Sequence, residues 1–219
     1  MEKDIYLRGI GYLPPYYYYD PKDQDKLLES IFKEGSILSR RKLGKQSNNG
    51  FGGVDYICLC DYELKDVFNE GRKRYNSYYQ YICNSLSIAF KKGSIDVIKP
   101  TIIDNCTLSL DGYRRMKYLG EQLERYSDLP DEVQVKDEIP LDKMTGITFP
   151  TKTFINLYSI RRKTKRLELL KEEINRLNEL IYKYGYDVKV YDVETLNEMT
   201  EDNIERLVLK RWQKTNKII

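Results

Sequence analysis

The hydrophobic pattern of the chain changes near residue 160, and this change limits the folds that the chain can adopt. Before this point, apolar residues form short strand-like runs that are separated by glycine, proline and polar stretches. Beyond it, apolar residues recur three and four apart, at Leu167, Leu170, Ile174, Leu177, Ile181 and Tyr184. A helix keeps such residues on one face, so the spacing predicts one long amphipathic helix ending at Gly185. The expected fold class is α+β.

We therefore expect residues 1–150 to form one domain and residues 151–219 to form a helical C-terminal extension packed on it. Within the extension, "YDVKVYD" is expected as an edge strand or extended arm, and "TEDNIERLVLKRWQK" as a last helix. The elements expected in the first part are a strand over Ile5–Leu7, a helix over Lys22–Glu34 capped by Gly35, a buried strand in "VDYICLC", a hairpin of "LSIAF" and "IDVIKPTII" joined by "KKGS", a helix over 112–130, a strand over 131–138 and a short strand "ITF".

Composition excludes several kinds of chemistry. The chain has no histidine, which rules out Ser-His-Asp and Cys-His catalysis. Its 4 cysteines include a C-x-C in "VDYICLC" but no C-x-x-C, so we expect buried free thiols and no metal site. The 37 basic residues nearly balance the 34 acidic ones, so net charge alone does not indicate a nucleic-acid partner. No apolar run approaches membrane-spanning length, and a cytoplasmic protein with no membrane contact is expected.

The stretch "DEVQVKDEIPLDKMTGI" is unusual because its polar residues alternate. Val133 and Val135 fall on one face of the expected strand, whereas Glu132, Gln134 and Lys136 fall on the other. Such a polar face commonly borders water, but it can also border a ligand. Glu132 and Gln134 would lie about 6.6 Å apart and could serve one ligand, whereas a straight strand would place Glu138 about 20 Å from Glu132.

The order of these motifs resembles that of the ADP-ribosyltransferase superfamily, and most closely the bacterial toxins that modify DNA. The resemblance spans about residues 5–150 and rests on a first strand with Arg8, a helix, "GSILSRR", the glycine-rich "GKQSNNGFGG", "VDYICLC", "LSIAF" and "DEVQVKDEIPLDKMTGI". It implies two facing antiparallel sheets with an NAD cleft between them. Residues 1–150 would then be the NAD-binding domain, and the reaction would be transfer of ADP-ribose from NAD, as substrate, to a nucleic acid or protein.

The resemblance also implies roles for particular residues. Glu132 would stabilise the cation-like sugar of the transition state, and Gln134 would orient the acceptor or a water molecule. The phosphates of NAD would be bound by Arg8 beside Gly9, and by Arg40 or Arg41; the nicotinamide pocket would be shaped by Tyr56 and Ser87. For each of these residues an ordinary surface or packing role is the alternative.

A basic run precedes the long predicted helix and comprises Arg161, Arg162, Lys163, Lys165 and Arg166. It could contact the phosphates of a nucleic acid, or it could be a solvated helix face. Two other functions stay open: NAD-dependent removal of a 2′-phosphate from RNA, and a catalytically inactive module that binds nucleic acid or protein. A toxin, defence protein or phage modifier, with an antitoxin or immunity partner, would fit the same pattern.

Overall fold

A computed structural model describes residues 1–10, 21–44, 55–65, 79–98, 131–157 and 163–216. The strands are β1 (Ile5–Ile10), β2 (Ser36–Leu38), β3 (Tyr56–Asp61), β4 (Leu86–Lys91), β5 (Glu132–Lys136), β6 (Glu138–Pro140), β7 (Met144–Phe149) and β8 (Lys189–Asp192). The helices are α1 (Pro21–Glu34), α2 (Tyr79–Ile82), α5 (Thr151–Leu157), α6 (Lys163–Lys183) and α7 (Glu201–Asn216), with 3-10 turns at Tyr62–Leu64 and Leu141–Lys143.

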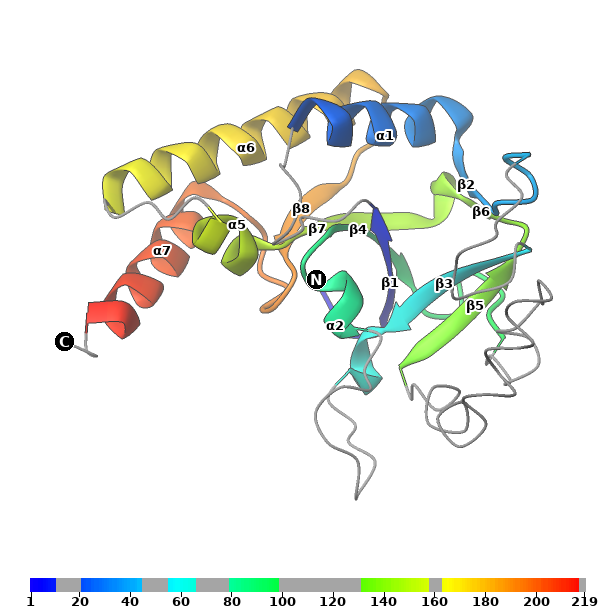
Figure 1. Ribbon diagram of the computed structural model, residues 1–219, viewed down its shortest axis with the longest axis horizontal. Coiled ribbons are helices and arrows are strands. Elements are labelled where there is room, and N and C mark those ends of the chain that lie inside the picture. Colours follow the sequence, from blue (N-terminus) through cyan, green and yellow to red (C-terminus); the bar gives the residue numbers. More distant parts are fainter. Residues whose placement is uncertain (11–20, 45–54, 66–78, 99–130, 158–162, 217–219) are drawn as a thin grey trace, which may run out of the picture.

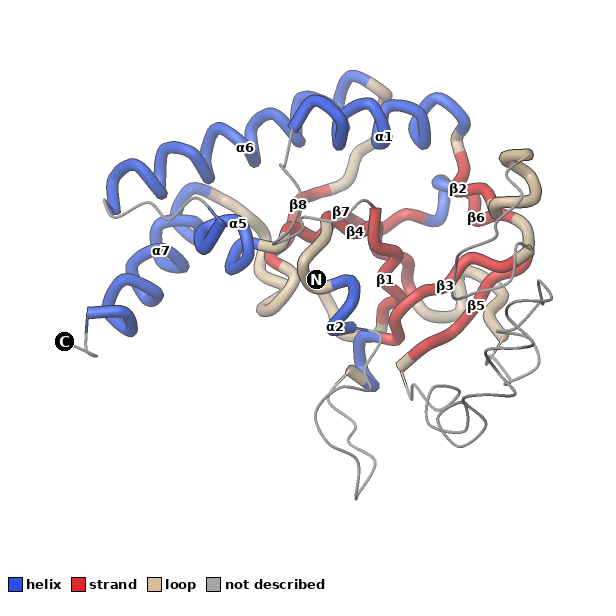
Figure 2. The backbone as a smooth tube through the Cα atoms, in the orientation of Figure 1, coloured by secondary structure: helices blue, strands red, loops and turns tan. Residues whose placement is uncertain are grey.

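The strands form a six-stranded sheet in the order β5-β3-β1-β4-β7-β8, and β2 and β6 form a separate antiparallel pair (Figure 2). Every neighbouring pair in the large sheet is antiparallel except β7 and β8, which are parallel. The chain is therefore an α+β protein, as predicted.

The C-terminal part of the chain belongs to the same sheet. Strand β8 pairs along β7, with Gly146 opposite Lys189 and Phe149 opposite Asp192. Two parallel strands need a long crossover, and α5 and α6 supply it here. The edge strand expected in "YDVKVYD", within the C-terminal extension of residues 151–219, is thus confirmed as β8.

The main core lies between one face of the six-stranded sheet and the two helices α1 and α6, which run side by side in Figure 1. Leu28 and Phe32 of α1 and Leu170 and Ile174 of α6 are buried in it. A fully buried side chain of this size stabilises the fold by about 1.5–3 kcal/mol. The opposite face of the sheet carries a smaller cluster, formed by Ile5, Leu7, Cys60, Tyr62, Ile82, Ala89, Val193 and Leu196.

Both long helices predicted from periodicity are confirmed, and glycines end them. Gly35 follows α1 with φ of 71°, and Gly185 follows α6 with φ of 77°. Glycine adopts this left-handed backbone without the steric cost that a Cβ imposes, so each helix stops where the sequence indicates. Among the described residues, no helix is long and apolar enough to cross a membrane.

Two strand predictions were wrong. The turn after β4 forms, with Gly93 at φ of 79°, but residues 95–98 do not pair with β4. Instead β4 lies between β1 and β7, and Ile98 forms an isolated bridge with Gln134. The expected strand over 131–138 is interrupted at Asp137, whose φ of 63° turns the chain from β5 into β6. The helix expected over 112–130 lies outside the described residues.

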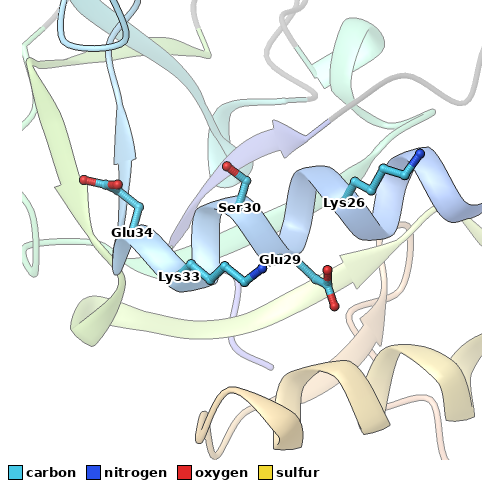
Figure 3. A pocket seen from close by; sticks show the side chains of 5 residues that line it. All are labelled: Lys26, Glu29, Ser30, Lys33 and Glu34. Atoms are coloured by element: carbon cyan, nitrogen blue, oxygen red, sulfur yellow. The ribbon is translucent and has the colours of Figure 1, made fainter.

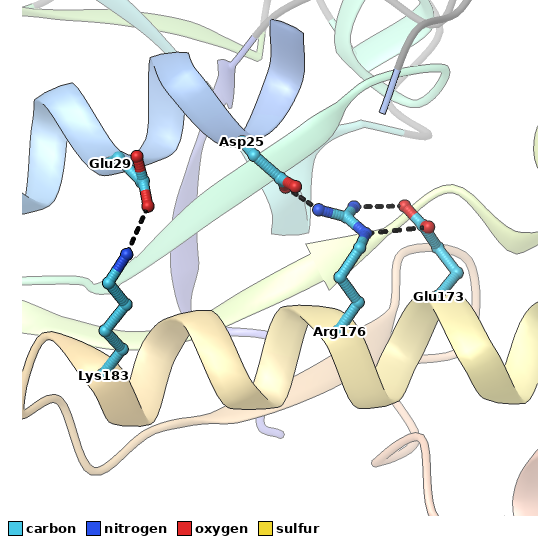
Figure 4. Close-up of polar contacts among 5 residues, drawn as sticks. All are labelled: Asp25, Glu29, Glu173, Arg176 and Lys183. Carbon is cyan, nitrogen blue, oxygen red and sulfur yellow. Dashed lines mark hydrogen bonds and ion pairs between the residues drawn. The ribbon is translucent and has the colours of Figure 1, made fainter. Parts of the chain in front are cut away.

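Polar contacts join α1 to α6 (Figure 4). Arg176 forms ion pairs with Asp25 of α1 and with Glu173 of its own helix, where Nη2 donates to Oε1 at 2.5 Å. Glu173 is only 8% exposed. Two turns further along α6, Lys183 donates to Glu29 at 2.7 Å from a well-exposed position. The two pairs therefore differ in how far water screens them.

Replacing Arg176 should destabilise the protein more than replacing Lys183. Arg176→Met leaves the buried carboxylate of Glu173 without its cation, and we expect a loss of about 2 kcal/mol, below the 3–5 typical of a fully buried pair. Lys183→Met removes an exposed pair, so its loss should be much smaller. Urea unfolding of both variants measures the difference, and equal losses would contradict this account of the interface.

Candidate active site

The register of β3 and β5 places two of the predicted site residues beside the C-x-C motif. Gln134 lies opposite Cys58, and Glu132 lies opposite Cys60. Directly opposed residues of an antiparallel pair point to the same side of the sheet, so these four side chains share one face. Val133 and Val135 point to the other face and join the main core under α1. The alternation predicted for this strand is therefore confirmed.

The polar face of β5 is buried rather than exposed to water. Glu132 is 7% exposed and Gln134 is 0% exposed. Gln134 Nε2 donates to Glu132 Oε1 at 3.4 Å, and the same nitrogen lies 3.6 Å from Cys58 Sγ. Ile98 covers the outer edge of the strand, because it exchanges two backbone hydrogen bonds with Gln134 at 2.8 and 2.9 Å. The alternating pattern had two interpretations, a face that borders water and a face that borders a ligand. The burial of Glu132 and Gln134 excludes the first.

Cys58 is a neutral thiol at this site. Part of the residue is exposed, but its sulfur is enclosed by neighbouring groups. Burial, together with the nearby charge of Glu132, raises the pKa of the Cys58 thiol to about 12, and Arg8 and Gln134 partly oppose this rise. Because only a thiolate is strongly nucleophilic, Cys58 is unsuited to act as a nucleophile near neutral pH. It can instead donate or accept hydrogen bonds.

Arg8 and Glu132 lie on opposite faces of the sheet. Side-chain alternation puts Arg8 with Tyr6 and Ile10, on the side of the main core. The β1–β3 pairs are Tyr6 with Asp61 and Leu7 with Cys60. Just beyond them, Arg8 Nη1 donates to the Cys58 carbonyl at 2.9 Å. Arg8 therefore contacts the strand that separates it from Glu132, rather than Glu132 itself.

Gly9 and Ser87 lie on the same face as Glu132, but protein fills the space in front of them. Gly9 lies opposite Ser87 in the β1–β4 pair. A Cβ at Gly9 would be 2.8 Å from Ser85 Oγ and 3.0 Å from Ile82 Cγ2, so the glycine is required by the close approach of the α2 segment. Ser87 is 0% exposed.

Tyr56 and the arginine pair lie at the far end of β5 from Glu132. Tyr56 begins β3 opposite Lys136, four residues or about 13 Å along the strand from the Glu132 end. Arg40 and Arg41 are exposed in the turn after β2. Arg41 Nη2 donates to Asp55 Oδ2 at 3.0 Å, which holds this turn next to Tyr56. Glu132 therefore lies at one end of the β3–β5 pair, the acidic end, and Tyr56, Arg40 and Arg41 lie near the other end, the basic end.

Asp131 is a polar residue of this region that the sequence reasoning missed. It is 0% exposed, and its Oδ2 accepts from the Tyr79 backbone N–H at 2.8 Å and lies 3.6 Å from Cys60 Sγ. It therefore fixes the start of α2 against β3. The sequence signal was the acidic pair "DE" at the start of the strand, but nothing local indicates that Asp131 would cap a segment 52 residues earlier in the chain.

Two hollows in the surface lie away from these residues. One, of about 390 Å³, lies along α1 and is lined by Lys26, Glu29, Ser30, Lys33 and Glu34 (Figure 3). The other, of about 360 Å³, lies between α6 and β8 and includes Tyr182 and Glu198. Among the described residues, no group of three or more His, Cys, Asp and Glu side chains could hold a metal ion.

Only part of the predicted basic run lies within the described residues. Arg161 and Arg162 lie outside them, and Lys163 is the first residue of α6. Lys165 is exposed and forms an ion pair with Glu168 at 3.8 Å. The first turn of α6 has no acidic residue. Basic side chains in a first turn oppose the helix dipole, so this arrangement is not explained by helix stability.

No family model, curated protein or solved structure matches the chain.

The stability of the protein should fall at alkaline pH through Cys58. Because its pKa is raised in the folded state, its contribution is complete below the unfolded pKa near 9.0 and is lost as pH rises toward about 12. From pH 8 to pH 10, we expect the free energy of unfolding to fall by about 1.4 kcal/mol more in the wild type than in Cys58→Ala. Urea unfolding at both pH values tests this, and identical pH dependence in the two proteins would contradict the enclosed thiol.

Proposed function

We propose that the protein transfers ADP-ribose from NAD to a macromolecule, with Glu132 as the catalytic carboxylate. The observation that carries this proposal is a buried glutamate at the first residue of an edge strand, hydrogen-bonded by a buried glutamine two residues later. Functional side chains are often placed in this way, where a rigid strand meets a connecting segment. The motif order that resembles the ADP-ribosyltransferases supplies the reaction type.

The chemistry requires a fixed negative charge. When the bond between nicotinamide and ribose breaks, positive charge develops on the sugar, and a preorganised carboxylate stabilises it more effectively than water can. Gln134 directs its amide N–H to Glu132 Oε1 at 3.4 Å. In the proposal, Gln134 therefore orients the carboxylate rather than contacting the acceptor, which differs from the role expected from sequence.

The basic end of the site would serve the phosphates. Arg41 is exposed and offers a planar pair of donors that Asp55 occupies, and a pyrophosphate group could compete for these donors. Arg8 would contribute through the guanidinium nitrogens that do not bind the Cys58 carbonyl. Because Arg8 and Glu132 lie on opposite faces of the sheet, a bound NAD molecule would have to extend around an end of β3 to contact both residues.

In this proposal the six-stranded sheet and the β2–β6 pair would form the two sheets of an ADP-ribosyltransferase-like fold, with residues 1–150 as the NAD-binding part.

The matched glutamates of this segment allow a direct test. Glu132→Gln should lower kcat for nicotinamide release from NAD by about 10²–10³-fold with little change in KM, because the charge acts on the transition state. Glu138→Gln should retain turnover, since Glu138 is half-exposed, pairs with Lys42 and belongs to another sheet. The assay uses the purified chain with DNA, RNA or protein as acceptor.

Two results would overturn the proposal. Equal turnover in both variants would remove Glu132 from the catalytic role. Absence of turnover by the wild-type chain with every acceptor, together with no NAD binding in calorimetry, would reject the reaction itself.

A second candidate function is favoured by the first turn of α6. Lys163, Lys165 and Arg166 lie at the start of this helix, whose first turn has no acidic residue, and such a turn could contact nucleic-acid phosphates. A catalytically inactive nucleic-acid-binding protein would bind single- or double-stranded DNA or RNA with an affinity that falls steeply with salt. Charge removal at Lys163 and Lys165 should then reduce the slope of log K against log salt by about 1–2, and an unchanged slope would exclude this surface.

A further inference from the structure

We infer that Cys58 is a positioning residue for the Glu132 carboxylate, acting as a neutral hydrogen-bond partner within a cluster of Glu132, Gln134 and Cys58, an inference that rests on the proposed function. Its basis is the geometry of the β3–β5 pair, in which Cys58 lies directly opposite Gln134. The Gln134 amide nitrogen lies 3.4 Å from Glu132 Oε1 and 3.6 Å from Cys58 Sγ. One amide group therefore links the carboxylate to the thiol.

Glu132 and Gln134 of this cluster are buried, so their polar groups must be satisfied by other groups of the protein. A carboxylate that is 7% exposed needs polar partners, because an unsatisfied buried charge is strongly unfavourable. A thiol is a weak donor, but an ionised acceptor strengthens the bond it makes. The electrostatics agree with the geometry, since the charge of Glu132 and its hydrogen bond both raise the pKa of Cys58. The proton thus stays on the sulfur, where it can be directed to the carboxylate.

The second cysteine of the C-x-C motif has a comparable environment and a different partner. Cys60 Sγ lies 3.6 Å from Asp131 Oδ2, and that carboxylate also accepts the Tyr79 backbone N–H. The two thiols on one face of β3 therefore have different neighbours, because Cys60 lies beside Asp131 and Cys58 lies beside Gln134. Cys60 and Asp131 fix α2, whereas Cys58 and Gln134 adjoin Glu132. The two cysteines of the C-x-C motif thus contact different polar groups.

Infrared spectroscopy can detect this contact without any enzymatic turnover. The S–H stretching band lies in a spectral region free of other protein absorption, and Cys58→Ala identifies the Cys58 band by difference. Glu132→Gln should shift that band to higher frequency, because a neutral amide accepts a weaker hydrogen bond than a carboxylate. Glu138→Gln should leave the band unchanged. Circular dichroism and thermal unfolding establish that each variant is folded.

Kinetics then test the positioning role. Cys58→Ala should lower kcat for nicotinamide release by about tenfold with KM unchanged, and Cys58→Ser, which keeps a donor, should recover most of the loss. An unshifted S–H band in Glu132→Gln would overturn the thiol–carboxylate contact even if Glu132 proves essential for turnover. Equal kcat in wild type and Cys58→Ala would overturn the positioning role. A wild-type chain without turnover would instead reject the proposed function, and with it the reaction that Cys58 would support.

Discussion

The pairing register of β3 and β5 determines how this edge of the molecule is organised. It sends Ile57, Leu59, Val133 and Val135 to the core beneath α1 and α6, and it sends Cys58, Cys60, Glu132 and Gln134 to the other face. A shift by one residue would exchange the two sets and bury a glutamate against the main core. These four apolar residues therefore specify the position of the acidic and amide groups indirectly, through the cost of exposing their own side chains to water.

The second face of the sheet is covered by short segments rather than by long helices. Tyr62 and Tyr79 donate their hydroxyl groups to the Val193 carbonyl at 3.0 and 3.1 Å, which ties the segment after β8 to the segments around α2. Asp131 and Gly9 allow α2 to approach the sheet closely. This cover consists of a few hydrogen bonds and small apolar contacts, in contrast to the continuous apolar faces of α1 and α6. The candidate carboxylate lies on this more polar side.

Local patterns predicted individual elements well and their partners poorly. The apolar spacing of α1 and α6, with Gly35 and Gly185 after them, is a property of contiguous residues, and both helices are where it indicates. The prediction of a hairpin after β4 was wrong, because a turn at Gly93 specifies only that the chain changes direction. It does not specify which strands lie beside β4 in the sheet. The site shows the same division: alternation put Glu132 and Gln134 on one face, but it could not place Arg8 on the opposite face or Tyr56 at the other end.

The sequence by itself determined the α+β class, the two long helices, the two faces of β5 and the chemistry that a chain without histidine can use. Only the tertiary structure decided that the polar face is buried, that β8 joins the main sheet, and that the cysteines lie beside Asp131, Glu132 and Gln134. The reason is physical. Periodicity reports which side chains share a surface, whereas the choice of water, protein or ligand against that surface depends on contacts between residues far apart in the chain.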